Sequence, residues 1–131
     1  MIVVDTNILA YLYLPGEFTE KAEKLLSEHA EWAAPQLWRS EFRNILAGYM
    51  RRGTFDLQHA IALQREAEAL LASGEYAIDS EAVLELVKNS DCSAYDCEFV
   101  ALAQMLRVKL FTMDAKLLKA FPAIAKPLDA G

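Results

Sequence analysis

The sequence predicts an α/β fold in which a short, mostly parallel central sheet lies between two layers of helices. Short apolar segments alternate along the chain with longer segments of helical periodicity. The helical segments are long enough for the crossover connections that parallel strands require. The first apolar segment, residues 2–4, is β-branched and suits a strand that is buried on both faces of such a sheet.

Length and composition predict a single domain that spans residues 1–131. A chain of 131 residues can bury a core without disulfides or a structural metal, and 54% apolar with 24% charged residues is ordinary globular composition. No segment approaches the ~18 uninterrupted apolar residues of a membrane helix, and the first residues lack a signal-peptide pattern. We therefore expect a cytoplasmic protein without a membrane partner. Its two cysteines, Cys92 and Cys97, are expected to be buried free thiols.

Turn and cap signals divide the chain into its expected elements. The first strand ends at Asp5, and Asn7 is the expected cap of the helix that follows. Further helices are predicted at residues 17–31, 36–52, 57–72, 80–88 and 93–107. Short apolar segments predict strands at residues 32–33, 76–78, 108–111 and 124–128.

The charge of the chain is unevenly distributed. A net charge of −6 argues against a nucleic-acid partner, because phosphate binding usually requires an excess of basic residues. Residues 36–53 differ from the rest, since their single acid is Glu41 and their arginines are Arg39, Arg43, Arg51 and Arg52. A solvent-exposed helix face explains this basic segment at least as well as a binding surface does.

Two acidic residues follow strands of the predicted sheet. Asp5 stands at the end of the first strand, and Thr112 and Asp114 follow the strand at residues 108–111. Functional groups of open parallel sheets gather at the carboxyl ends of the strands. Taken singly, each aspartate is better explained as a helix N-cap, because a helix is expected after both.

Two further acids fall on the inward faces of predicted helices. Glu41 lies four residues from both Leu37 and Ile45 in the apolar stripe of its helix. Asp96 is followed at helical spacing by Phe99 and therefore also faces inward. Carboxylates are rarely buried unless they are paired, hydrogen-bonded or bound to a cation, so both positions need an explanation.

Each of these two acids also has a purely structural explanation. Ser93 and Asp96 fit a capping box, in which the carboxylate only satisfies backbone donors. Glu41 fits a buried ion pair with one of the nearby arginines, of which the candidates are Arg39, Arg43 and Arg65. Four separate structural explanations, two for helices and two for strand ends, are less economical than one shared site at the edge of the sheet.

Four carboxylates at one edge would repel one another unless divalent cations neutralised them. Oxygen-only ligands favour hard ions, so the expected cofactor is Mg²⁺ or Mn²⁺, as one or two ions. His29 and His59 lie in polar helical segments and offer no competing metal site. Acidic clusters that hold such ions commonly hydrolyse phosphodiesters, because the metal lowers the pKa of the attacking water and stabilises charge on the phosphate.

The sequence resembles the PIN-domain nucleases, and among them the small toxin ribonucleases of the VapC type. The resemblance runs through VVDTNILAYL, RSEFRNIL, SAYDCEFVALA and LFTMD in this order and spans nearly the whole chain. It implies a three-layer α/β/α PIN-like fold and a metal-dependent endoribonuclease, the toxin of a VapBC-type toxin–antitoxin pair. It places the catalytic and metal-binding acids at Asp5, Glu41, Asp96 and Asp114, with Thr6, Asn7 and Thr112 as supporting residues.

The resemblance also implies partners. They are a structured RNA such as tRNA or ribosomal RNA, a cognate antitoxin that blocks the active site, and a second copy of the chain in a homodimer. Arg39 and Arg43 flank Glu41 and are the candidate RNA contacts, with ion pairing as the alternative.

Three other classes of protein share parts of the pattern. A phosphotransferase of the haloacid-dehalogenase type would have a second aspartate where this chain has Asn7. A receiver domain would need a phosphoacceptor after a later strand, where Asp79 is more typical of a helix cap. A PIN fold that only binds RNA or protein would not need all four acids, and an activity assay separates it from a nuclease.

Overall fold

A five-stranded parallel sheet forms the centre of the computed structural model, which describes residues 1–130. The strand order is β3-β2-β1-β4-β5, and every pair of neighbours is parallel. The strands are β1 (Ile2–Val4), β2 (Trp32–Pro35), β3 (Glu75–Tyr76), β4 (Leu110–Phe111) and β5 (Ala125–Lys126). The predicted α/β class is confirmed, and the sheet is wholly rather than mostly parallel.

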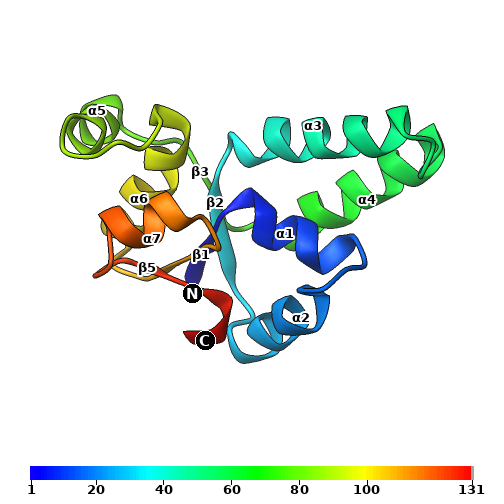
Figure 1. Ribbon diagram of the computed structural model, residues 1–131, viewed down its shortest axis with the longest axis horizontal. Coiled ribbons are helices and arrows are strands. Elements are labelled where there is room, and N and C mark those ends of the chain that lie inside the picture. The colour runs from blue at the N-terminus through cyan, green and yellow to red at the C-terminus, as the bar shows by residue number, and fades with distance from the viewer. Residues whose placement is uncertain (131) are drawn as a thin grey trace.

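Helices cover both faces of this sheet. They are α1 (Thr6–Tyr13), α2 (Thr19–Glu28), α3 (Trp38–Arg51), α4 (Leu57–Leu70), α5 (Ser80–Lys88), α6 (Ala94–Leu106) and α7 (Ala115–Ala120), followed by the short 3-10 helix η1 (Leu128–Ala130). Figure 1 shows α5, α6 and α7 on one side of the strands and α1 to α4 on the other. No helix between residues 1 and 130 combines the length and apolarity that crossing a bilayer requires.

The core lies where the two helical layers meet the sheet. All residues of β1 and β2 are buried, as expected of strands that are covered on both faces. The largest fully buried side chains come from the helices and the central strands, and they include Trp38, Phe42, Phe99, Ile8, Leu102 and Leu110. Burial of each such side chain contributes roughly 1.5–3 kcal/mol. Cys92 and Cys97 are buried and free, as expected.

The register of the two central strands positions the first pair of polar residues. Val4 of β1 is paired with Phe111 of β4, so the next residues, Asp5 and Thr112, lie side by side where the two strands end. The N–H of Asp5 also donates to the carbonyl of Phe111 at 3.2 Å. Strand pairing therefore brings together residues that are far apart in the sequence.

Several expected boundaries differ from the structure by one to three residues, and two helix starts show why. Asp5, not Asn7, caps α1: its carboxylate accepts a hydrogen bond from the N–H of Ile8, and the helix already begins at Thr6. Helix α2 begins at Thr19 rather than at residue 17, because the Thr19 hydroxyl accepts from the N–H of Gly16 and holds a turn there. Both differences come from a side chain that bonds the backbone at a position other than the one that the apolar pattern indicates.

The third strand is also displaced from its expected position. It occupies Glu75–Tyr76 instead of residues 76–78, because its pairing with Ala34 and Pro35 of β2 decides which residues extend. Gly74 permits this approach, since a Cβ atom there would lie 2.2 Å from the carbonyl oxygen of Trp32.

Candidate active site

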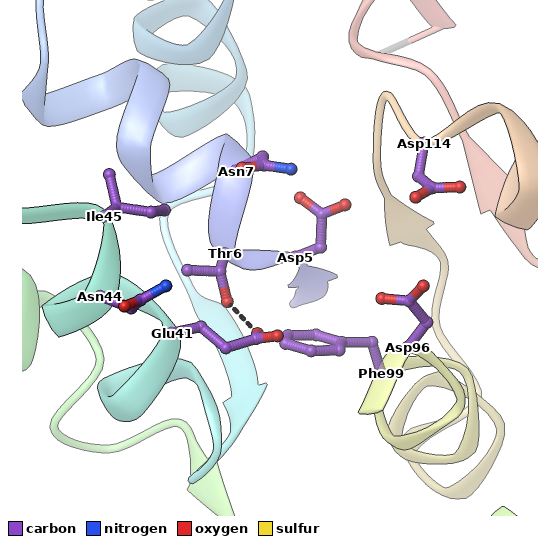
Figure 2. Close-up of a pocket in the computed structure, with 9 residues that line it drawn as sticks. All are labelled: Asp5, Thr6, Asn7, Glu41, Asn44, Ile45, Asp96, Phe99 and Asp114. Atoms are coloured by element: carbon purple, nitrogen blue, oxygen red, sulfur yellow. Dashed lines mark hydrogen bonds between the residues drawn. The ribbon is translucent and has the colours of Figure 1, made fainter. Parts of the chain in front are cut away.

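A pocket of about 250 Å³ opens at the carboxyl edge of the sheet, and all four predicted acids line it (Figure 2). Its full lining is Asp5, Thr6, Asn7, Glu41, Asn44, Ile45, Asp96, Phe99 and Asp114. We call it the acid pocket. Its acids come from the ends of β1 and β4 and from the first turns of α3 and α6. Helices that alternate with parallel strands begin at this edge, which explains why residues from four elements converge here.

Asp5 is the most deeply buried of the four acids. The residue is 7% exposed, and its carboxylate accepts hydrogen bonds from the N–H of Ile8, at 3.1 Å, and from the hydroxyl of Thr112. Burial raises its pKa to about 6; the two hydrogen bonds oppose this rise, and the charges of Asp114 and Asp96 add to it. A carboxylate in this state is stabilised by a cation that shares its pocket.

Thr112 joins two of the acids. It is fully buried, its hydroxyl donates to Asp5, and its oxygen accepts from the N–H of Asp114 at 3.0 Å. Asp114 in turn caps α7, because its carboxylate accepts from the N–H of Leu117 at 3.1 Å. The supporting position expected for Thr112 thus corresponds to a hydroxyl that fixes the orientation of Asp5 and the backbone of Asp114.

Glu41 enters the pocket from the opposite wall. It lies in the first turn of α3 and accepts a hydrogen bond from the hydroxyl of Thr6, at 2.7 Å. Burial raises its pKa; the bond from Thr6 opposes the rise, while the charges of Asp96 and Glu98 reinforce it. Thr6 is itself buried at the start of α1, so it holds Glu41 as Thr112 holds Asp5.

Asp96 lies half-buried in the first turn of α6. The hydroxyl of Ser93 accepts from the N–H of Asp96 at 3.1 Å, which is one of the two bonds of a capping box. Among residues 1–130 the reciprocal bond, from the N–H of Ser93 to the Asp96 carboxylate, is absent. Burial and then the charge of Asp114 raise the pKa of Asp96, whereas the hydrogen bond with Ser93 and the charge of Lys116 oppose the rise. Figure 2 shows the carboxylate of Asp96 facing the pocket.

None of the four acids forms an ion pair within residues 1–130, although the charge of Lys116 partly opposes the rise in the pKa of Asp96. The ion pairs of this part of the chain involve Lys21, Lys24 and Arg39, whose partners lie outside the acid pocket. The predicted alternative of an ion pair between Glu41 and an arginine is therefore not formed. Buried carboxylates are usually paired, so four acids that form no ion pair in one pocket leave negative charge there that a cation can neutralise.

The oxygen ligands that the acid pocket offers suit a hard divalent ion. No group of three or more His, Cys, Asp or Glu side chains in the described chain is close enough to hold one ion as it stands. Mg²⁺ keeps several of its waters and is usually held by one or two carboxylates, so a closed cage of side chains is not required. The buried carboxylate of Asp5, held only by neutral donors, is the observation that supports the fit.

The two arginines predicted to contact RNA lie outside the pocket lining. Arg39 donates two hydrogen bonds to Glu75, at 2.6 and 2.7 Å, and lies 3.2 Å from Glu68. This is the ion-pairing alternative that the sequence left open for Arg39. Arg43 is exposed on α3 and donates to the carbonyl of Arg39, at 3.1 Å.

Three pocket residues were not predicted: Asn44, Ile45 and Phe99. Asn44 and Phe99 lie three residues after Glu41 and Asp96 respectively, so helical periodicity places each beside an acid. That spacing was a usable signal for both. Asn7, predicted as a supporting residue, lines the pocket with an exposed side chain although it does not cap α1.

Known proteins resemble this chain in sequence. Residues 2–123 match the family model described as PIN domain. Ribonuclease VapC3 from Pyrobaculum aerophilum is 32% identical over 129 residues, which cover 96% of this chain and 98% of that protein.

Two solved structures share the fold. A toxin–antitoxin complex from Klebsiella pneumoniae superposes with a TM-score of 0.68 at 21% identity and covers 98% of each chain. FitAcB from Neisseria gonorrhoeae superposes with a TM-score of 0.74 at 16% identity, over 95% of this chain and 96% of that one. These likenesses concern the arrangement of the backbone.

Proposed function

The chain belongs to the PIN-domain family, and we propose that it is a metal-dependent endoribonuclease, the toxin of a VapBC-type toxin–antitoxin pair. The acid pocket carries the proposal, because its four carboxylates form no ion pair within residues 1–130. The name of the relative at 32% identity, a ribonuclease, supports RNA as the substrate. A pocket that only bound protein would have no need to concentrate negative charge in this way.

Asp5, Glu41, Asp96 and Asp114 are the residues that would hold one or two Mg²⁺ or Mn²⁺ ions. When bound, the metal supplies a water of lowered pKa and positive charge next to the phosphate. The chain itself fixes the carboxylate oxygens. Thr112 and the N–H of Ile8 each bond one oxygen of Asp5.

The remaining walls set the reaction geometry. Thr6 fixes one oxygen of Glu41 and leaves the other free to orient a water on that side of the pocket. Phe99 supplies an apolar wall that lowers the local dielectric and strengthens charge interactions within the pocket. Burial and then the charges of neighbouring acids raise the pKa values of Asp5, Glu41 and Asp96, and a bound cation would relieve the repulsion among these charges.

The test is cleavage of RNA by the purified protein without any antitoxin. We expect cleavage of total tRNA and ribosomal RNA with Mg²⁺ or Mn²⁺, none with excess EDTA, and recovery when Mn²⁺ is added beyond the EDTA. Cleavage that continues at full rate in EDTA would refute the metal-dependent reaction.

The proposal includes two protein partners, a cognate antitoxin and a second copy of the chain. Support for the antitoxin comes from the toxin–antitoxin complex that shares the fold. An apolar groove between α3 and α4, lined by Leu46, Met50, Leu57, Ala60 and Ile61 among others, offers a surface for it. Copurification with the product of the adjacent gene tests the antitoxin, and light scattering of the isolated chain tests the homodimer. A monomer at micromolar concentration would refute the homodimer.

A further inference from the structure

A second cavity continues from the acid pocket along α1. It measures about 310 Å³ and shares Asn7 and Ile45 with the acid pocket. Its walls come from α1, the connection between α1 and α2, and α3. The metal chemistry proposed above uses none of its other residues.

Aromatic rings form much of the lining of this second cavity. They belong to Tyr11, Phe18 and Tyr49, and all three are only partly buried. Tyr11 packs on Phe18 with ring centroids 4.9 Å apart, and Tyr49 stacks on Phe55 with centroids 5.2 Å apart. Packing therefore fixes the rings while part of each remains accessible. We call this space the aromatic cavity.

The loop that closes the aromatic cavity is held in one shape. Thr19 accepts a hydrogen bond from the N–H of Gly16, at 3.0 Å, and its hydroxyl donates to the carbonyl of Tyr11, at 2.8 Å. These bonds tie the loop to α1. A cavity that is already formed binds a ligand without an ordering cost.

Charged groups of both signs lie near the rings of the aromatic cavity. Burial raises the pKa of the Tyr11 hydroxyl, and the charges of Asp5 and Glu17 raise it further. Carboxylate and amide groups accept or donate hydrogen bonds at base edges. Cations lie beside the rings, with Arg52 4.5 Å from the ring centroid of Tyr49. Such cations can neutralise a phosphate of the same strand.

We propose that the aromatic cavity binds an unpaired nucleobase of the RNA strand whose phosphate occupies the acid pocket. The inference rests on the proposed nuclease function, because it assumes that the substrate is RNA. Unstacked bases of loops and single strands bind on aromatic side chains, and every base has a face that can do so. The two cavities share Asn7, so a base in one and a phosphate in the other belong to neighbouring nucleotides.

The experiment measures binding without cleavage. Short single-stranded oligoribonucleotides carry the fluorescent base 2-aminopurine at one position, which is moved along the strand, and Ca²⁺ replaces Mn²⁺. A second series carries an abasic ribose at the same positions. The proteins are wild type, Tyr11→Leu, Tyr49→Leu, Tyr11→Phe, which keeps the ring, and Tyr76→Leu, which removes an aromatic ring outside the cavity. Thermal melts show that each variant is folded.

We expect wild type to quench 2-aminopurine at one position. The abasic strand should bind roughly 5- to 160-fold more weakly there, the range of one base stack. Tyr11→Leu and Tyr49→Leu should lose the quenching and should bind the intact and abasic strands with equal affinity. Tyr11→Phe and Tyr76→Leu should quench 2-aminopurine and prefer the intact strand as wild type does.

Three results would overturn the aromatic cavity as a base site. They are equal affinity of wild type for intact and abasic strands, absence of quenching at every position, and a Tyr11→Leu variant that binds RNA normally but no longer captures its antitoxin. The last would assign the cavity to a side chain of a protein partner. Quenching without cleavage in Mn²⁺ would refute the nuclease and leave the base site standing, while cleavage without a base effect would do the reverse.

Discussion

Two carboxylates near the sheet, those of Asp5 and Glu75, accept hydrogen bonds from different kinds of donor. Glu75 on β3 accepts two hydrogen bonds from the guanidinium of Arg39, at 2.6 and 2.7 Å, and one from the indole N–H of Trp38, at 2.8 Å. The bonds from Arg39 lower its pKa. Asp5 accepts only from neutral donors, and burial raises its pKa to about 6.

The difference separates a structural acid from one that is available to a ligand. The charge of Glu75 is already compensated, and the cluster that compensates it joins α3 to β3. The charge of Asp5 is oriented but not compensated, so the folded chain retains an attraction for cations at that point. The kind of hydrogen-bond donor, more than the degree of burial, therefore indicates which carboxylates take part in binding.

The largest expected effect is the loss of RNA cleavage when the uncompensated charge of Asp5 is removed. Asp5→Asn keeps the cap of α1, because asparagine caps helices as well as aspartate does, but it removes the charge. We expect at least about a 100-fold loss of Mn²⁺-dependent RNA cleavage, since a metal ligand is lost. The free energy of unfolding in EDTA should be unchanged or higher.

Asp56→Asn is the matched control for this variant. Asp56 caps α4 with the same kind of bond, to the N–H of His59 at 2.8 Å, and lies outside the acid pocket. The Asp56→Asn variant should cleave RNA as wild type does. Equal activity of the two variants would mean that Asp5 only caps a helix.

The next effect concerns metal and stability. A cation that binds only the folded protein adds about 2.7 kcal/mol at a hundredfold excess over its Kd, or several degrees of Tm in a domain of this size. Wild type should show this shift between EDTA and millimolar Mn²⁺. Asp96→Asn should match or exceed the wild-type Tm in EDTA, because repulsion falls, and lose most of the shift.

The control for the stability test is Asp79→Asn, which changes the N-cap of α5. That variant should keep the full shift with Mn²⁺. Absence of any Mn²⁺-dependent shift in wild type would contradict a metal site in the acid pocket.

A smaller effect, on the free energy of unfolding, is expected at Glu75, whose charge Arg39 compensates. Glu75→Gln should cost about 1 kcal/mol at pH 7, between the values of exposed and buried pairs, because Arg39 is partly exposed. The folded pKa of Glu75 is lowered, so its contribution is complete above about pH 4.3 and is lost as pH falls through the folded pKa.

Urea titrations of wild type and Glu75→Gln between pH 7 and pH 3 measure this contribution. The two free energies of unfolding should converge at the acidic end. A constant difference at all pH values would show that the side chain acts through shape instead of charge.

The smallest effect concerns the approach of RNA. Arg43 is exposed and its guanidinium forms no ion pair within residues 1–130, whereas Arg39 is committed to Glu75. Arg43→Ala should therefore weaken RNA binding a few-fold and reduce the log–log salt slope by roughly 0.7 to 0.9. Lys88→Ala, an exposed cation at the end of α5, is the control. Equal slopes for the two variants would exclude Arg43 as a phosphate contact.

The parts of the fold that the sequence predicted are those with a long or repeated signal. The α/β class followed from the alternation of apolar and helical segments, and α5 was predicted with its observed bounds. Strands β3 and β5 have only two residues each, and no periodicity is visible in two residues. Their positions depend on pairing with β2 and β4, which the sequence does not display.

The grouping of the acids was predictable for a related reason. Asp5 and Asp114 follow strands and Glu41 and Asp96 face inward on helices, and parallel topology brings such positions to one edge. The pairing of Arg39 with Glu75 was not predictable, because 36 residues separate them and charge alone gives no partner. The supporting roles of Thr6 and Thr112 were expected through family resemblance, whereas their hydrogen bonds join residues far apart in the sequence and depend on the fold.

The two caps that lead from the acid pocket into helices make certain backbone amides useful as spectroscopic probes. The N–H groups of Ile8 and Leu117 donate directly to the carboxylates of Asp5 and Asp114. An amide proton shifts when its acceptor gains a proton or a cation, so these two resonances would report the state of each acid separately. The helices themselves need not move for the signal to appear. An NMR titration of ¹⁵N-labelled protein could therefore follow occupancy of the pocket residue by residue, with no RNA present.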